Sequence, residues 1–362
     1  MKILFFSSAL TGGGAERVLS ILANAMADNG KDVVIATDLS YPIAYKFDDR
    51  VKLTSYRKEP KFLGRFQIVR FISMLKEMRC IARMNKPDIM VSFQTSMNIF
   101  TFFSLFGLKA PLILCEHTNV RRNISLRKLS LMCYPFAKAV TVLTRSDYQY
   151  WHKRPGKKNV VYMPNPYIGK ELQIKQEQRD KVVIAVGRVN SWEVKGFDNL
   201  IRSWSSVCHS YLDWSLVIAG NYDEKSLAFL NDLIQETNSI NVKFLGFRND
   251  IDNILRRSKV FVLSSRTEGL PMGLLEAMAA GCCCVSFDVV TGPNEIITNG
   301  VDGILVENQS IKALTEALEK VMSDEVLLNQ LASKAPTALK RYSLDRILRR
   351  WDILFSKVTT TN

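Results

Sequence analysis

Short apolar runs rich in β-branched and aromatic residues recur along the chain, and amphipathic stretches separate them. Such runs are typical of buried parallel strands, and the stretches between them predict crossover helices. The predicted strands are 2–7, 32–37, 110–115, 139–143, 160–163, 182–186, 215–219, 242–245, 260–263 and 283–287. Predicted helices are 18–29, 198–208, 225–236, 251–258 and 311–322. The pattern therefore predicts an α/β protein with two doubly wound parallel-sheet domains.

The length of 362 residues also favours two cores over one. The turn Pro164-Asn165-Pro166 lies between the two series of strands and predicts the boundary. We expect an N-terminal domain at 1–166, a second domain at 167–340 and a C-terminal helix at 341–362. That helix begins after Ser343 and carries one apolar stripe, which we expect to pack back on the first domain.

No apolar run approaches the roughly 20 residues of a membrane-spanning helix. The start, MKILFFSSAL, has a short apolar core that leads into Gly12-Gly13-Gly14, so it is interpreted as a first strand rather than a signal peptide. Without an export signal, the seven cysteines are expected to be thiols in the cytoplasm. Cys282-Cys283-Cys284 leads into a strand, where neighbours point to opposite faces, so no metal is expected there.

Positive charge is concentrated in the first domain. Residues 1–167 contain 26 lysines and arginines against 11 aspartates and glutamates, whereas the remainder is nearly balanced. A helix near 68–86 carries its apolar residues on one face and basic residues on another. The predicted membrane- and acceptor-facing cations are Arg65, Lys76, Arg79, Arg83, Lys86, Arg121 and Arg122. This surface favours peripheral binding to an anionic membrane; no recognised nucleic-acid motif accompanies it, so nucleic acid is not expected as a partner.

Residues 264–281 form the most informative stretch. A buried strand is followed by a polar loop with Glu268, and Pro271 then suits the first position of a helix that carries Glu276. The open amides at the helix start form an anion site between the two carboxylates. Two acids that flank an anion site would suit a ligand with hydroxyls at both ends and phosphate in the middle. The alternative is that both acids are solvated surface residues.

Other candidates follow predicted strands. Gly187-Arg188 and Lys195-Gly196 bring two cations toward a sheet edge, and His117 and Glu116 end another strand. The glycines 12–14 could bind a diphosphate. Binding of a nicotinamide dinucleotide is less favoured, because Arg17 occupies the place of the third glycine of the dinucleotide-binding motif. Asp250 and Asp252 open a helix, where capping is a better account than metal binding.

Together these motifs resemble the retaining nucleotide-sugar glycosyltransferases of family 4, which have the two-Rossmann-domain GT-B architecture facing a central cleft. The resemblance covers nearly the whole chain. It rests on Glu268 and Glu276 with seven residues between them, on Gly187-Arg188 with Lys195-Gly196, on the segment GGGAER at 12–17, and on Glu295 followed by Asn299-Gly300 and Gly303.

The resemblance implies a role for each matching residue. Glu276 would bind the donor ribose, Glu268 and His117 would meet the donor sugar, and Arg188 and Lys195 would neutralise the leaving diphosphate. The donor site would also include Gly13, Gly14, Gly187, Phe247, Arg248, Gly269, Leu270 and Pro271. The family retains anomeric configuration without a protein nucleophile, and no metal or other cofactor is implied.

The segment ILCEHTN and the basic first domain look most like bacterial enzymes that extend polyprenyl-diphosphate-linked oligosaccharides. The expected activity is transfer of a hexose or N-acetylhexosamine from a nucleotide sugar to a lipid-linked saccharide at the inner face of the cell membrane, and the expected donor is a UDP sugar. The alternatives are a GT-B epimerase or phosphorylase acting on a soluble sugar, and a non-catalytic membrane- or nucleic-acid-binding module.

Overall fold

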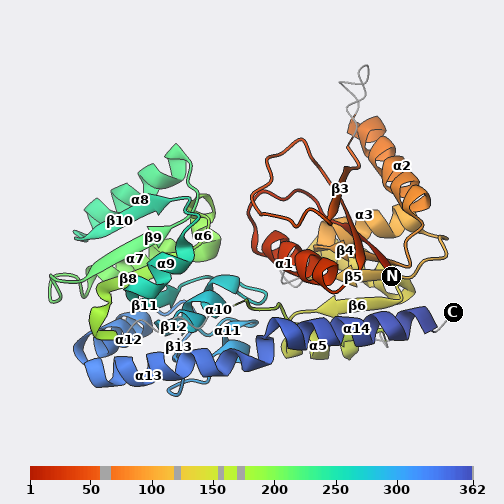
Figure 1. Ribbon diagram of the computed structural model, residues 1–362. Coiled ribbons are helices and arrows are strands. Elements are labelled where there is room, and N and C mark those ends of the chain that lie inside the picture. Colours follow the sequence, from red (N-terminus) through yellow and green to blue (C-terminus); the bar gives the residue numbers. More distant parts are fainter. Residues whose placement is uncertain (58–66, 118–123, 154–158, 169–175, 361–362) are drawn as a thin grey trace. The chain divides into compact units, whose positions relative to one another are not determined.

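The computed structural model describes residues 1–57, 67–117, 124–153, 159–168 and 176–360. The chain forms two compact units: Met1–Pro166 together with Leu344–Asn362, and Tyr167–Ser343. Each unit is a parallel β-sheet with helices on both faces (Figure 1). The predicted fold class, two Rossmann-like doubly wound domains, is confirmed.

The described part of the first unit contains a seven-stranded sheet in the order β3-β2-β1-β4-β5-β6-β7. Its strands are β1 Lys2–Phe6, β2 Asp32–Thr37, β3 Lys52–Ser55, β4 Ile89–Phe93, β5 Leu112–Cys115, β6 Ala139–Val142 and β7 Val160–Tyr162. Its helices are α1 Gly14–Asp28, α2 Gln67–Asn85, α3 Thr95–Leu105, α4 Ile124–Cys133, η1 Tyr134–Phe136, α5 Arg145–His152 and α14 Leu344–Thr360. The strand order reverses direction between β1 and β4, which is where ligands bind in such sheets.

The described part of the second unit contains a six-stranded sheet in the order β10-β9-β8-β11-β12-β13. Its strands are β8 Asp180–Val186, β9 Ser215–Ala219, β10 Val242–Gly246, β11 Ser258–Leu263, β12 Cys283–Phe287 and β13 Ile304–Val306. Its helices are η2 Gln176–Gln178, η3 Val189–Ser191, α6 Trp192–Lys195, α7 Phe197–Ser205, α8 Glu224–Glu236, α9 Ile251–Arg257, α10 Met272–Ala279, α11 Pro293–Ile296, α12 Ile311–Ser323, α13 Glu325–Ala338 and η4 Leu339–Tyr342. Here the order reverses between β8 and β11.

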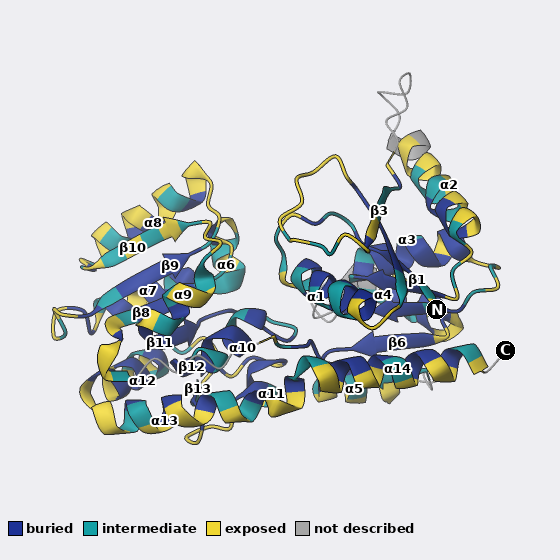
Figure 2. Ribbon diagram, viewed as in Figure 1, coloured by how far each residue is buried: buried dark blue, intermediate teal, exposed yellow. Residues whose placement is uncertain are grey.

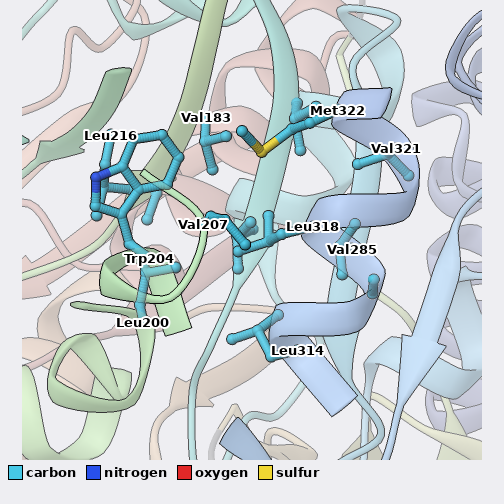
Figure 3. Close-up of a cluster of buried hydrophobic side chains, with 14 of the residues drawn as sticks. Val183, Leu200, Trp204, Val207, Leu216, Val285, Leu314, Leu318, Val321 and Met322 are labelled. Atoms are coloured by element: carbon cyan, nitrogen blue, oxygen red, sulfur yellow. The ribbon is translucent and has the colours of Figure 1, made fainter. Parts of the chain in front are cut away.

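The cores explain why the predicted strands are nearly continuous in apolar residues. Helices cover both faces of each sheet, so the central strands, such as β4, β11 and β12, are buried along their length (Figure 2). In the second unit, Trp204 of α7 and Leu318 of α12 belong to one cluster with Val183 and Val285 of the sheet (Figure 3). In the first unit, α2 and α3 pack against β1, β2 and β4.

Most predicted strands lie within two residues of the observed ones, but the pattern missed several elements. Strand β4 and helix α3 were not predicted, because α3 and β5 share the long apolar stretch 97–114 and no polar period separates them. Strand β3 was missed because its residues are exposed or half-buried. Helix α1 begins at Gly14, four residues before the predicted start, so the last of the three glycines is helical.

Helix α14 belongs to the first unit and packs against α1. Ile347, Trp351 and Phe355 on its apolar stripe are buried. An ion pair between Lys31 and Asp352, 2.8 Å long, joins it to the start of the chain. Among the described residues, no helix is both long enough and apolar enough to cross a membrane.

Candidate functional site

In the second unit, the candidate donor residues follow the two strands at which the sheet order reverses. Strands β8 and β11 are parallel neighbours, with Val260 opposite Val183. The loop after β8 contains Gly187 and Arg188 and leads to Lys195, and the loop after β11 contains Glu268. Parallel strands end at the same sheet edge, so two loops that are far apart in the sequence meet there.

Lys195 and Glu268 are in direct contact at this edge. The Nζ atom of Lys195 donates to Oε1 of Glu268 at 2.7 Å. The two side chains are only 24% and 12% exposed, so water screens this ion pair less than a surface pair. The structure therefore brings together two residues that the sequence placed on separate motifs.

Close backbone contact positions Lys195. Gly196 has a φ of +64°, and a Cβ atom there would lie 1.9 Å from the carbonyl oxygen of Ser264. Only glycine fits between the end of α6 and the β11 loop. The hydroxyl of Ser264 also donates to the Lys195 carbonyl at 2.9 Å.

Arg266 clamps the same two segments and was missed by the sequence analysis. Its guanidinium donates to both carboxylate oxygens of Asp198 at 2.8 and 2.7 Å, and its amide donates to the Val194 carbonyl at 2.9 Å. This bidentate geometry fixes the β11 loop on the start of α7. No local pattern distinguishes Arg266 from any other loop arginine.

Glu276 lies in the second turn of α10 and is 8% exposed. Pro271 is the residue before the first helical turn, one position earlier than predicted. Gly292 has a φ of +101°, and a Cβ there would lie 2.5 Å from the Gly269 carbonyl oxygen. Thr291 donates its hydroxyl to the Glu268 carbonyl. The loop from Gly269 through Leu270 is thus held against the residues after β12.

Two residues of the predicted donor site are exposed at the carboxyl ends of strands in the same sheet. Arg188 is exposed directly after β8, and Phe247 is 52% exposed after β10. Arg248 was expected in the donor site. In the structure its guanidinium forms two 2.7 Å hydrogen bonds to the carboxylate of Asp250.

The predicted capping role of the Asp250 side chain is wrong. Asp250 occupies the position before α9, but its carboxylate makes no cap hydrogen bond. The carboxylate instead binds Arg248, which lies two residues away and offers a charged donor.

In the first unit, a side chain from the first turn of α1 binds the backbone of the glycine turn that follows β1. Oε2 of Glu16 accepts from the amides of Gly12, at 3.0 Å, and Gly13. Glu16 is the third residue of α1, the usual position for such a contact. The Gly12 and Gly13 amides, which we expected to bind a diphosphate, therefore already donate to the carboxylate of Glu16. Gly14 begins the helix itself.

Gln94 also contacts this turn, and the sequence analysis did not identify it. It follows β4 and has a φ of +77°, a conformation that costs a residue other than glycine about 1–3 kcal/mol. Its side chain accepts from the Ser8 hydroxyl at 3.0 Å and donates to Glu16 at 3.3 Å. Gln94 thus links the ends of β1 and β4, where the order of the first sheet reverses.

His117 and Glu116 lie at the end of β5, as predicted, but in different surroundings. The His117 ring stacks on Phe93 with centroids 4.5 Å apart, and burial lowers its pKa to about 3, so the imidazole is neutral near pH 7. Glu116 is 4% exposed and points into the unit, where it accepts from Thr95 at 2.7 Å and Asn98 at 3.3 Å. Burial raises the pKa of Glu116 to about 8.

Glu116→Gln is expected to change how stability depends on pH. The unfolded carboxyl ionises near 4.5 and the folded one near 8. Between these values the folded protein keeps a proton that the unfolded chain releases, so the parent loses up to about 1.4 kcal/mol per pH unit as pH rises. The variant should lack this loss in urea unfolding across the range. Glu319→Gln, at an exposed position of α12, is the control; parallel curves for parent and Glu116→Gln would contradict the expectation.

The predicted basic residues fall into three groups. Lys76 and Arg83 are exposed on α2, and Lys86 is exposed directly after it. Arg79 instead donates to the carbonyls of Ser104 and Phe106, at 2.8 and 2.9 Å, and so closes the end of α3. Arg65, Arg121 and Arg122 lie outside the described residues.

Comparison with known proteins connects both units to one class of enzymes. Residues 12–167 match the family model described as Glycosyltransferase Family 4, and residues 170–338 match the model described as Glycosyl transferases group 1. The chain is 27% identical to an uncharacterized glycosyltransferase of Haemophilus influenzae, covering 97% of this chain and 98% of that protein.

One further relative and one solved structure match over nearly the full length. The chain is 29% identical to a Campylobacter jejuni α-1,4-N-acetyl-D-galactosaminyltransferase named for a PP-undecaprenol-linked saccharide, with 99% of each chain covered. A solved structure of Anabaena Alr3699/HepE with UDP and glucose superposes with a TM-score of 0.80 at 17% identity, covering 99% of this chain and 100% of that one. The structural match shows the shared fold.

Proposed function

The chain belongs to the family 4 glycosyltransferases, which have the GT-B fold, and we propose that it moves a hexose or N-acetylhexosamine from a UDP sugar to a lipid-linked saccharide, with retention of configuration. The observation that carries the donor part is the contact between Lys195 and Glu268 at the reversal point of the second sheet. A cation and an acid joined there offer adjacent places for a phosphate and for sugar hydroxyls.

Each donor residue has a role in this proposal. Lys195 and Arg188 stabilise the negative charge that develops on the diphosphate as the sugar leaves. Glu268 accepts hydrogen bonds from the sugar hydroxyls, and its hydrogen bond to Lys195 keeps both groups in place. Glu276 binds the ribose hydroxyls. The exposed ring of Phe247 supports binding of the base beside the backbone of Gly246 to Arg248.

The chemistry needs no protein nucleophile in this proposal. The acceptor hydroxyl approaches the anomeric carbon on the face that the diphosphate leaves, and a phosphate oxygen takes its proton. Lys195 and Arg188 hold the diphosphate throughout the transfer. His117 is neutral near pH 7, so it contributes as a hydrogen-bonding group rather than as a cation.

The lipid-linked acceptor is proposed from the relatives and the charge distribution. The Campylobacter jejuni relative is named for an undecaprenol-linked substrate, and the first 167 residues carry an excess of positive charge. Exposed Lys76 and Arg83 of α2, with Lys86 directly after the helix, suit an anionic membrane surface or an acceptor diphosphate. The protein would then work peripherally on the inner face of the cell membrane.

The donor assignment is tested by a thermal-shift screen of nucleotide sugars, followed by mass spectrometry of a polyprenyl-diphosphate-linked saccharide incubated with the best donor. A gain of one sugar mass is the expected product, and its linkage is then read by nuclear magnetic resonance as α or β. No stabilisation by any nucleotide sugar would contradict the proposed function.

Glu276→Gln is expected to weaken UDP binding about 10- to 100-fold, because hydrogen bonds to a charged acceptor are worth roughly 1.5–3 kcal/mol. Isothermal titration with UDP measures this change directly. Glu319→Gln, on the exposed face of α12, is the matched control and should bind UDP like the parent. Equal affinity for both variants would remove Glu276 from the donor site.

A further inference from the structure

Exposed aromatic side chains gather at the end of α3 and on the α4–η1 segment of the first unit. Phe103, Phe106 and Phe136, which we call the aromatic patch, are 55%, 65% and 73% exposed. The ring of Phe102 lies between them, with centroid distances of 5.5 Å to Phe103, 5.7 Å to Phe106 and 6.3 Å to Phe136. The exposed rings therefore share one buried base rather than being scattered singly.

A pocket of about 170 Å³ opens beside the aromatic patch. Its wall includes the apolar side chains of Phe102, Leu105, Leu108 and Pro111, together with Phe106 and Phe136 of the patch. Clustered exposed apolar side chains, unlike single ones, are often part of a binding surface.

The described segments that carry the aromatic patch are basic. Residues 95–117 and 124–138 contain four lysines and arginines and a single acid, Glu116, which is buried. Lys109, Lys128 and Lys138 are exposed on the segments that carry the patch and the pocket. Two copies that paired through this surface would bring like charges together, whereas an anionic bilayer offers apolar chains below negative headgroups.

We propose that the aromatic patch enters the boundary between the headgroups and the acyl chains of an anionic bilayer. The rings of Phe103, Phe106 and Phe136 bury in hydrocarbon, while Lys109, Lys128 and Lys138 contact the headgroups. This deepens the proposed function, since it assigns the membrane contact to α3 and the α4–η1 segment. It also differs from adsorption through the basic face of α2, because insertion of apolar rings resists salt and attraction of charges does not.

Flotation with vesicles tests the proposal. The full-length protein is mixed with vesicles of phosphatidylcholine alone, or of phosphatidylcholine with phosphatidylglycerol, at low and high salt. Each of Phe103→Ser, Phe106→Ser and Phe136→Ser should lower vesicle affinity about tenfold, because burying most of an exposed phenylalanine is worth roughly the 1.4 kcal/mol of one factor of ten. The triple variant should lose the part of binding that survives high salt.

Two matched controls are available elsewhere on the chain. Val326 and Ile353 are 78% and 69% exposed but lie on α13 and α14. Val326→Ser and Ile353→Ser should bind vesicles like the parent. Circular dichroism confirms that each variant is folded, and leucine at all three phenylalanine positions should preserve most of the binding, which distinguishes lost apolar contact from lost folding.

Salt-resistant vesicle binding by the folded triple variant that equals the parent's would overturn the proposal. So would a parent that is dimeric by light scattering and becomes monomeric in the triple variant while vesicle binding stays unchanged, since the patch would then join two copies. The proposed function fails separately. Vesicle binding that depends on the patch, in a protein that binds no nucleotide sugar, would uphold the membrane surface and reject the transferase reaction.

Discussion

Lys195→Ala is expected to lower the turnover number of sugar transfer about 100- to 1,000-fold, with a much smaller change in donor affinity. The cation is placed to stabilise charge that is greatest when the sugar–phosphate bond breaks, and removing one such group from a preorganised site costs roughly this factor. The substitution also leaves Glu268, which is 12% exposed, without the ion pair that the structure shows. Steady-state kinetics with a UDP sugar and a lipid-linked acceptor measures the effect.

Strand β8, which precedes Lys195 in the chain, provides the control. Lys181 near the start of β8 also forms an ion pair, with Asp213, but both side chains are about half exposed and lie away from the carboxyl edge. Lys181→Ala should leave turnover near that of the parent. Combining Lys195→Ala with Glu268→Gln should cost less than the sum of the two single losses, because the two groups act as a unit. Additive losses would show that they act independently, and normal turnover in Lys195→Ala would reject the mechanism.

Gly196→Ala is expected to destabilise the second unit by roughly 2–5 kcal/mol and to weaken UDP binding in the protein that remains folded. The left-handed backbone alone costs alanine about 1–2 kcal/mol, and overpacking adds about 1–3. The added Cβ would lie 1.9 Å from the Ser264 carbonyl oxygen, a backbone atom that moves only with its loop. Displacing that loop shifts Glu268 relative to Lys195. Chemical unfolding and UDP titration measure the two effects.

Gly300 separates the backbone cost from the contact. Its φ is +74°, close to that of Gly196, but no atom lies within 4 Å of the position its Cβ would take. Gly300→Ala should therefore cost only the roughly 1–2 kcal/mol of the left-handed conformation and leave UDP binding intact. Equal destabilisation of the two variants would mean that the close approach between Gly196 and Ser264 has no energetic weight.

The accuracy of the predicted elements follows from burial. Strands 32–37, 215–219 and 283–287 match β2, β9 and β12 residue for residue, because both faces of each sheet are covered and the whole strand must be apolar. Helix α3 was not predicted for a similar reason. Its residues are apolar on nearly all sides, so the sequence shows no helical period between them and β5. The family assignment is confirmed, since its motifs depend on residue identity and spacing rather than on exact element boundaries.

The amino-acid sequence was sufficient to predict the fold class, the family and the candidates Glu268, Glu276, Arg188 and Lys195, because strand-ending motifs are local and parallel strands end at one edge. Which of these groups are in contact depends on the three-dimensional fold. The contact of Lys195 with Glu268 joins loops more than 70 residues apart. Arg266, Gln94 and the closing of the glycine turn by Glu16 likewise depend on partners from other strands or on backbone geometry, and a linear pattern carries no record of either.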